Sequence, residues 1–500
     1  MAKNKPVYAF EEADSKKRML LGGKGAGLSE MTRLKLPVPP GFTITTEICN
    51  KYYDNNGKLP KDVMPAVMKN IAKMEKKTGK KWNSTKNPLL VSVRSGAAIS
   101  MPGMMDTILN LGLNEKTVEG FAEQTKNPRF SWDSYRRFIQ LFGKVVFGVN
   151  DEKFDHVLDD AKEKQGVTDD SKLSVESLKS IVSKYKKICE EHTKRKFPDT
   201  PNEQLVLSIE AVFKSWMGER AIVYREKNNI TKDIANGTAV NVVTMVFGNM
   251  GDDSATGVVF TRNGHNGKKE IEGEYLINAQ GEDVVAGVRT GKSIELLKKD
   301  MPKSHKELSN ACAKLEKHFR EPQDIEFTIE QGKFYLLQTR TAKMSAAALV
   351  KTSVDMVKEK LINKDKALTR IPAQQLEALL HRTMDESKIK DFKKLAKGIA
   401  ASPGAASGIV VFDVKKAIEL GDSGKKVILV RKETKPEDVP AFFSSEGILT
   451  SLGGKSSHAA IVSRGMGKPC IVGCPELKID YDNNIGTANG MTIKEGETIT

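Results

Sequence analysis

The chemistry of this sequence centres on a histidine that follows a pair of glycines. The run GILTSLGGKSSHAAIV predicts a strand, a tight turn at Gly453 and Gly454, and then a helix capped by Ser456 or Ser457. His458 would lie at the positive N-terminal end of that helix, where backbone N–H groups favour a bound phosphate. An imidazole nitrogen placed there can act as a nucleophile and carry a phosphoryl group. A lone histidine is more often structural than catalytic, so this interpretation depends on the residues around His458.

Two pairs of polar side chains recur at alternate positions between residues 323 and 340. In the run QDIEFTIE, Asp324 and Glu326 share one face of a predicted strand, and apolar residues pack behind them. Gln338 and Arg340 repeat this arrangement on the next predicted strand. Two carboxylates on one face can hold Mg²⁺ against the phosphates of ATP. Taken alone, each pair is explained equally well by a half-buried strand with one solvent-exposed face.

Basic residues near glycines provide candidate phosphate ligands. Lys24 stands in LLGGKGAGLSEM, where little side-chain bulk blocks a phosphate, although a plain glycine turn explains the run equally well. Arg94 ends a strand predicted from residue 89, and the Gly/Ala/Met-rich loop that follows it could close over a triphosphate. Residues 286–293, AGVRTGKS, come closer to the spacing of a Walker loop. We reject them as a phosphate site because no continuous hydrophobic strand precedes them.

The order of predicted elements indicates several domains of α/β and α+β class. Residues 1–343 mix strands, such as residues 240–246, with helices, and about 114–203 is helical in period, as expected of a helical insert. Residues 344–400 contain strong helix formers and read as a helical linker. Residues 401–500 alternate strands and helices, as in a small α/β domain. Its predicted strands are residues 408–412, 427–431, 447–450 and 470–472.

Composition limits the class of protein. At 500 residues the chain exceeds what one core usually serves, and no apolar stretch approaches the roughly 20 residues that span a membrane. The net charge of +16 is dispersed along solvated helix faces, so we expect anionic small substrates rather than nucleic acid. Five scattered cysteines and an N-terminus without a targeting pattern predict a reducing, cytoplasmic location.

These motifs together resemble the pyruvate, phosphate dikinase family. The histidine loop resembles the phosphohistidine loop shared by pyruvate, phosphate dikinase, phosphoenolpyruvate synthase and enzyme I of the sugar phosphotransferase system. The resemblance to the first of these families covers essentially the whole chain. It rests on residues 22–31, 36–46, 93–112, 133–140, 247–257, 278–285, 324–340 and 453–470. It implies an ATP-grasp nucleotide-binding domain over residues 1–343, and a swivelling β/α phosphohistidine domain over residues 401–500, joined by the helical linker.

The resemblance also implies roles for individual residues. His458 is implied to attack the β-phosphate of ATP through Nε2 and to release AMP, after which phosphate removes the γ-group as diphosphate. The implied phosphate ligands are Lys24, Arg94 and Arg340, with Arg137 for inorganic phosphate. The implied ligands of the ATP–Mg²⁺ assembly are Asp324, Glu326 and Gln338. A monovalent cation, K⁺ or NH₄⁺, is implied as a second cofactor, and ATP, phosphate, pyruvate and phosphoenolpyruvate as substrates or products.

Three features depart from the family pattern. The sequence stops at Thr500, so we expect the pyruvate-binding barrel to be missing and this chain to carry only the loading of His458. Ser456 replaces a threonine that is phosphorylated in some members, which makes it a candidate regulatory phosphosite for a kinase and phosphatase. Lys455 replaces a common methionine and adds a positive charge beside the histidine.

Two alternative functions stay open. A water dikinase similar to phosphoenolpyruvate synthase would release free phosphate and need no phosphate as co-substrate. The run MPGMMD at residues 101–106 favours the phosphate-dependent enzyme. A phosphohistidine carrier without catalytic activity would be phosphorylated by a partner and would bind no ATP.

Overall fold

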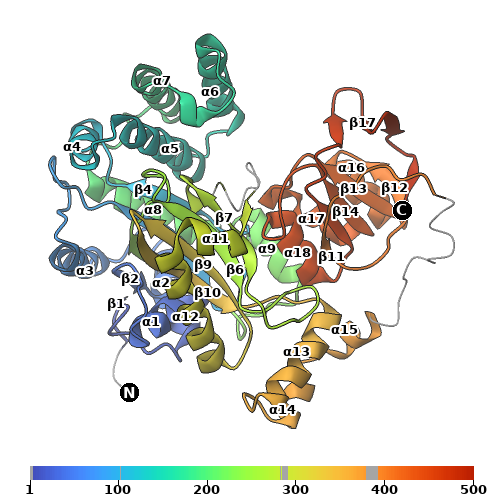
Figure 1. Ribbon diagram of the computed structural model, residues 1–500. Coiled ribbons are helices and arrows are strands. Elements are labelled where there is room, and N and C mark those ends of the chain that lie inside the picture. Colours follow the sequence, from blue (N-terminus) through green and yellow to red (C-terminus); the bar gives the residue numbers. More distant parts are fainter. Residues whose placement is uncertain (1–3, 102, 282, 284–290, 379–391) are drawn as a thin grey trace. The chain divides into compact units, whose positions relative to one another are not determined.

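The computed structural model describes residues 4–101, 103–281, 283, 291–378 and 392–500. The chain forms two compact units, Met1–Val246 and Phe247–Thr500. Both units combine helices with sheets, which confirms the predicted mixed α/β and α+β class (Figure 1). The domain boundaries predicted at residues 343 and 400 fall inside the second unit and stay predictions. Pro102, and most of the rejected loop 286–293, lie outside the described residues.

The first unit is built on an antiparallel five-stranded sheet. Its strands, in spatial order, are β1 (Val7–Ala9), β2 (Gly41–Ile44), β5 (Thr238–Thr244), β3 (Val91–Ala97) and β4 (Thr107–Leu111). Every residue of β5 is buried, including the polar Asn241 at its centre. The helices α2 (Thr46–Asp54) and α3 (Val63–Thr78) contact the strands β5 and β2, respectively.

Glycines bring the helix α1 (Arg18–Arg33) close to this sheet. Gly22 interrupts the helix with φ of 68°, and a Cβ there would lie 1.9 Å from the carbonyl oxygen of Gly96. A Cβ at Gly25 would lie 2.7 Å from Oγ1 of Thr43. Two glycines of the lysine-containing run are therefore required by helix–sheet packing.

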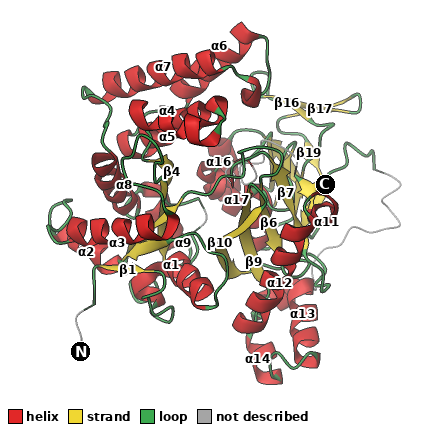
Figure 2. Cartoon of the chain, turned by 60° about the vertical axis from the view of Figure 1, so that its left-hand side comes forward, coloured by secondary structure: helices red, strands yellow, loops and turns green. Residues whose placement is uncertain are grey.

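Helices occupy most of the chain between β4 and β5. They are α4 (Glu115–Thr125), α5 (Pro128–Phe147), α6 (Glu152–Gln165), α7 (Val175–Thr193), α8 (Pro201–Ser215) and α9 (Glu219–Lys227). Figure 2 shows α6 and α7 side by side. The helical stretch thus continues past residue 203, where the predicted insert ends. Within the described residues, no helix is both long and apolar enough to cross a membrane.

The second unit begins with another antiparallel sheet. Its order is β10 (Lys333–Thr341), β9 (Gln323–Glu330), β6 (Ala255–Phe260), β7 (Glu272–Ile277) and β8 (Lys292–Ser293). The helix α12 (Pro302–Phe319) contacts both β9 and β10. The register between β9 and β10 shifts once, between Leu336 and Gln338.

Three helices follow this sheet in the region of the predicted linker. They are α13 (Ala346–Lys358), α14 (Lys364–Thr369) and α15 (Ala373–Ala378). The guanidinium of the fully buried Arg262 donates to Glu359, just after α13, at 2.8 Å, and also bonds Glu316 in α12. These charge-assisted bonds tie α13 to the sheet that precedes it. Residues 379–391 of the predicted linker lie outside the described residues.

The C-terminal part of the second unit has a six-stranded sheet. The order is β11 (Ile399–Ser402), β15 (Cys470–Val472), β14 (Gly447–Thr450), β13 (Val427–Arg431), β12 (Gly408–Val411) and β19 (Thr498–Ile499). The strands β12, β13, β14 and β15 are parallel and confirm the four predicted strands, with β12 one residue shorter. Their parallel pairing brings the loops that follow β13 and β14 to one edge.

Each face of this sheet is covered by a different layer. Ile428 and Val430 pack against Leu477 and Ile493, which belong to or flank a small sheet. That sheet consists of β16 (Lys478–Asp480), β17 (Ile485–Ala488) and β18 (Met491–Lys494). The helices α16 (Val414–Asp422), α17 (Val439–Ser444) and α18 (His458–Met466) contact the six-stranded sheet. The continuous burial of β13 follows from this coverage.

Candidate functional site

His458 is the first residue of α18 and follows a loop that starts at the end of β14. We call residues 451–457 the histidine loop. Gly453 adopts φ of 99°, a left-handed conformation that confirms the predicted tight turn. Ser457 occupies the N-cap position as predicted, but its side chain makes no capping hydrogen bond. The first backbone N–H groups of α18 therefore face the site without a side-chain cap.

The two ring nitrogens of His458 have different surroundings. Nδ1 lies 3.2 Å from the hydroxyl of Thr434. Nε2 is buried and has no hydrogen-bond partner among the described residues. Burial lowers the pKa of His458 to about 4, although the charge of Glu437 opposes this shift. The imidazole is consequently neutral at pH 7, as a nucleophilic nitrogen must be.

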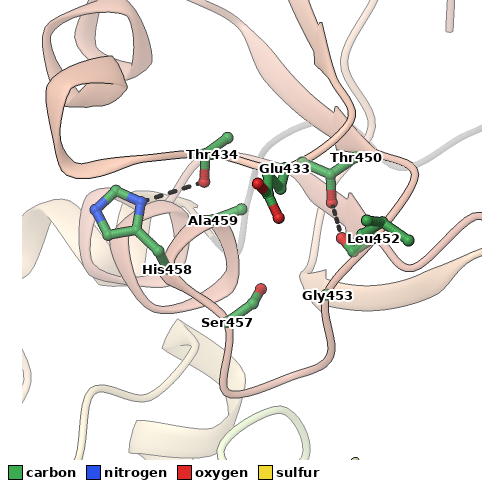
Figure 3. Close-up of a pocket in the computed structure, with 8 residues that line it drawn as sticks. All are labelled: Glu433, Thr434, Thr450, Leu452, Gly453, Ser457, His458 and Ala459. Atoms are coloured by element: carbon green, nitrogen blue, oxygen red, sulfur yellow. Dashed lines mark hydrogen bonds between the residues drawn. The ribbon is translucent and has the colours of Figure 1, made fainter. Parts of the chain in front are cut away.

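A small pocket surrounds this histidine (Figure 3). It is lined by residues from the loop after β13, the end of β14, the histidine loop and the start of α18: Glu433, Thr434, Thr450, Leu452, Gly453, Ser457, His458 and Ala459. Figure 3 shows the Nδ1 side of the ring turned toward Thr434 and the other nitrogen turned away. His458 is 9% exposed. Reaction at Nε2 therefore requires a phosphate donor that meets the ring from the side opposite Thr434.

Two glutamates of β7 contact the histidine loop. The ammonium of Lys455 forms an ion pair with Glu272. The backbone N–H of Lys455 donates to Glu274 at 3.3 Å, and the hydroxyl of Ser456 donates to the same carboxylate at 3.4 Å. Ser456 is only 1% exposed. The candidate phosphosite is thus enclosed next to a carboxylate, and burial raises the pKa of that Glu274 carboxyl.

Four of the predicted site residues meet on the β9–β10 hairpin. Asp324 pairs with Arg340 across the strands, and Glu326 pairs with Gln338. Nε of Arg340 donates to Oδ2 of Asp324 at 2.6 Å, whereas Oδ1 of Asp324 is buried without a partner in the described part of the chain. Asp324 is 4% exposed, and this burial raises the pKa of its carboxyl despite the charge of Arg340. The hairpin therefore presents oxygen ligands together with a guanidinium on one face.

Lys24 and Arg94 lie close together in the first unit. Lys24 is half-buried in α1, and a Cβ at Gly96 would lie 3.2 Å from the Cβ of Lys24. Arg94 is in β3, two residues before Gly96, and its Nε donates to Oγ of Ser92 at 3.1 Å. The close packing of α1 on β3 thus positions both basic residues of the predicted phosphate site.

Arg137 belongs to a network of charges in α5. Its Nε lies 3.1 Å from Asp133, and Nη2 lies 3.4 Å from Asp170. Although burial disfavours the carboxylate of Asp133, the charges of Arg136, Arg137 and Arg129 hold its pKa well below the usual range. These carboxylates fix Arg137 in place, and three arginines gather around Asp133.

Sequence reasoning missed Thr434 and the two glutamates of β7. A signal for Thr434 was present, because it follows β13 by three residues, and β13 pairs in parallel with the strand that leads to His458. Groups that bind ligands gather at the carboxyl ends of such neighbouring strands. No comparable signal marks Glu272 and Glu274, which are nearly two hundred residues from the loop that they contact.

Comparison with known families identifies similarity along most of the chain. The family model described as pyruvate phosphate dikinase, AMP/ATP-binding domain, matches residues 18–59, 55–306 and 302–361. The model described as PEP-utilising enzyme, mobile domain, matches residues 424–500 and so includes His458. The two matches together include every predicted site residue.

Curated relatives give the same picture. The chain is 52% identical over 496 residues to a pyruvate, phosphate dikinase of Entamoeba histolytica, and 50% identical over 495 residues to that of Clostridium symbiosum. It is 46% identical to the chloroplastic pyruvate, phosphate dikinase 1 of Arabidopsis thaliana. These alignments cover 99% of this chain, but 56%, 56% and 52% of the respective relatives. The chain thus spans little more than half the length of these relatives.

Proposed function

Because the chain belongs to the pyruvate, phosphate dikinase family, we propose that it carries the ATP- and phosphate-dependent half of the family reaction. The complete reaction converts ATP, pyruvate and phosphate into AMP, phosphoenolpyruvate and diphosphate. In the half assigned to this chain, His458 receives a phosphoryl group from ATP. The observation that supports this most directly is the neutral ring of His458, whose Nδ1 is engaged by Thr434 while Nε2 has no partner among the described residues.

The proposed chemistry starts with the lone pair of Nε2. A bond forms between Nε2 and the β-phosphorus of ATP, while the bond from that phosphorus to the oxygen of the departing AMP breaks. An oxygen of inorganic phosphate then attacks the γ-phosphorus, and diphosphate leaves with a phosphoryl group remaining on His458. Backbone N–H groups at the start of α18 favour the negative charge that arrives there.

Asp324, Glu326 and Gln338 are the residues that we propose to hold Mg²⁺. The fit is supported by the buried Oδ1 of Asp324, which has no partner within the described ranges, and by the position of Gln338 opposite Glu326. Oxygen atoms from one or two carboxylates, completed by phosphate oxygens, are the usual ligands of Mg²⁺ in ATP-dependent enzymes. When bound, the ion would neutralise charge on the phosphates. The monovalent cation stays a prediction of the family resemblance.

Basic residues complete the proposed phosphate-binding groups. Lys24 and Arg94 would hold phosphates of ATP, and their proximity in the first unit supports a joint role. Arg340 would bridge Asp324 and a phosphate, since its guanidinium has further donors beside the Nε that Asp324 accepts from. Arg137 would bind inorganic phosphate within the arginine-rich surroundings of Asp133.

The same proposal includes the domain organisation and the location. Residues 1–343 would form the ATP-grasp domain, residues 344–400 the linker and residues 401–500 the domain that swivels with His458. A reducing compartment such as the cytoplasm is supported by the cysteines, all five of which are free and buried. Burial raises the pKa of the thiols of Cys470 and Cys474 to about 12 and about 11, so neither is reactive at neutral pH.

A labelling experiment tests the proposed function. The purified chain is incubated with Mg²⁺, phosphate and ATP labelled at the β-phosphorus, and acid-labile label on the protein is measured. We expect label that is absent from His458→Ala and diphosphate that forms only when phosphate is present. Label that persists in His458→Ala, or its absence from the unmodified chain, contradicts the proposal. Release of free phosphate without added phosphate would instead identify a water dikinase, and label only from a phosphorylated partner protein would identify a carrier.

A further inference from the structure

Arg464 contacts the histidine loop and the first sheet of the second unit at the same time. It lies in α18, and the residue is 5% exposed. Its Nε donates to the carbonyl oxygen of Ala401 at 3.1 Å, and its Nη2 donates to the carbonyl oxygen of Lys455, also at 3.1 Å. The guanidinium also lies over the ring of Phe260, at 5.3 Å from the ring centre. One side chain thus links three segments that are far apart in the sequence.

The surroundings of Arg464 are unfavourable for a charged side chain, so a role in stability alone does not explain this residue. Its contacts with Ala401 and Lys455 are to neutral carbonyls, and no carboxylate lies within ion-pair distance in the described part of the chain. Burial accordingly lowers the pKa of its guanidinium. A buried cation without an ionic partner is costly, whereas an apolar side chain could fill the same space. Its positive charge instead acts on Asp324 and Glu272, in the part of the second unit that contains the proposed Mg²⁺ ligands.

We propose that Arg464 is a positioning residue for the loading of His458. The bond to Lys455 fixes the backbone of the histidine loop three residues before His458. Stacking on Phe260 seats the same loop against β6, the strand that pairs with the Asp324 strand. Because these contacts position the loop against the sheet of the proposed Mg²⁺ ligands, Arg464 should affect the phosphorylation of His458 only when the donor is ATP held by the nucleotide-binding residues. This inference rests on the proposed function and adds a residue to it.

The test compares two phosphate donors on the same variants. ATP with Mg²⁺ and phosphate loads His458 by the proposed route. Phosphoramidate is a small donor that transfers its phosphoryl group directly to an imidazole nitrogen and releases ammonia, so it needs no seating of the loop. In Arg464→Met we expect labelling from ATP to fall about a hundredfold, because misplaced reacting groups lose rates of this size. Labelling from phosphoramidate should stay within about twofold.

Three further variants make the comparison specific. Arg464→Lys keeps the charge and can still donate to a carbonyl oxygen, so it should recover part of the rate from ATP. Phe260→Leu removes the ring but not the loop bond, and should slow only the ATP route. Lys468→Met is the matched control, since Lys468 is a half-buried cation of the same segment that donates to the carbonyls of Phe443 and Ser445, not to the histidine loop. It should lower the melting temperature and leave labelling from ATP unchanged in the folded protein.

The outcomes separate this inference from the proposed function. An equal loss with both donors in Arg464→Met means that the residue only maintains the fold or the chemistry of the ring, and overturns the inference. Unchanged labelling from ATP overturns it as well. If the unmodified chain takes no label from ATP but takes it from phosphoramidate, the proposed function itself fails, and the inference about Arg464 fails with it.

Discussion

The hydroxyl of Thr434 lies 3.2 Å from Nδ1 of His458, although the two residues are 24 positions apart in the sequence. They meet because they follow the neighbouring parallel strands β13 and β14. If Nδ1–H donates to the hydroxyl oxygen, Nε2 carries the lone pair and is the nucleophilic nitrogen. The opposite tautomer would place a proton on Nε2 and block its attack. Thr434 therefore favours Nε2 as the reacting nitrogen when its hydroxyl accepts from Nδ1–H.

Replacing Thr434 by valine should slow the loading of His458. The substitution keeps the shape of the side chain and removes the acceptor for Nδ1–H, so both tautomers become populated. We expect the initial labelling rate from ATP to fall about fivefold, corresponding to a hydrogen bond of about 1 kcal/mol. Thr434→Ser keeps the hydroxyl and should keep the rate. Nitrogen NMR shifts of His458 report the tautomer, and unchanged shifts in Thr434→Val would contradict this assignment.

The low pKa of His458 predicts how stability depends on pH. The unfolded chain binds a proton at His458 near pH 6.5, whereas the folded chain does so only near its pKa of about 4. Protons therefore favour the unfolded state as the pH falls through this window. The free energy of unfolding of the unmodified chain should therefore fall by at most about 3 kcal/mol, and His458→Gln should not show this decrease. Denaturant unfolding of both proteins at pH 7.5 and pH 5 measures the difference, and parallel changes in the two would refute the prediction.

Asp324→Asn should change the melting temperature and the labelling of His458 to very different extents. The carboxyl of Asp324 is buried with a raised pKa and an unpartnered Oδ1 within the described residues, so its charge costs folding energy. The neutral amide removes the cost of the buried charge but leaves Arg340 without its ionic partner, so the melting temperature should change little, while labelling of His458 falls more than about a hundredfold. Asp355→Asn is a suitable control, because Asp355 pairs with Lys351 on α13, away from the hairpin. A lower melting temperature with normal labelling in Asp324→Asn would reverse this interpretation.

The charges of Lys455 and Glu272 should be interchangeable between the two positions. Lys455→Glu and Glu272→Lys each place like charges together and should each slow labelling from ATP. The double variant restores opposite charges and should recover most of the rate, with a coupling of about 1 kcal/mol between the two positions. High salt should weaken the effect because both groups are partly exposed. Additive losses in the double variant would show that the two residues act independently.

Ser456→Glu imitates the charge of a phosphorylated serine at the candidate regulatory site. The new carboxylate would face Glu274, whose oxygen accepts the present hydroxyl at 3.4 Å. Like charges in this enclosed place should displace the histidine loop and lower labelling from ATP at least about tenfold. Ser456→Ala loses only a long hydrogen bond and should label at a rate within about twofold of the unmodified chain. Normal labelling of Ser456→Glu would remove the physical basis for regulation at this residue.

The sequence made the strands around His458 predictable, but not all of the residues that they bring together. The strands β13, β14 and β15 have the bounds that their short apolar runs indicate; β13 and β14 are mostly buried, whereas Ile471 of β15 is exposed. The histidine, the turn at Gly453 and the alternating carboxylates were readable for the same local reasons. Thr434 and Glu274 were not recognised, because their roles depend on which distant segments fold against the histidine loop. The extent of the helices beyond residue 203 was missed because α8 is more apolar than the charged helices before it.

The shifted register of the β9–β10 hairpin makes this site unusually sensitive to a change of length. Before the shift, Leu336 opposes Phe327 on the apolar face; after it, Gln338 and Arg340 oppose Glu326 and Asp324 on the polar face. Leu337 is the additional, unpaired residue of this bulge, and deleting it would leave Gln338 opposite Glu326. In a ladder that keeps the single bulge, inserting one residue between Leu337 and Gln338 would instead move Gln338 opposite Ile325 and turn Gln338 and Arg340 toward the core. Every residue of the proposed site would still be present in such a protein, so a survey of point substitutions would never reveal this vulnerability, whereas a scan of single-residue insertions would.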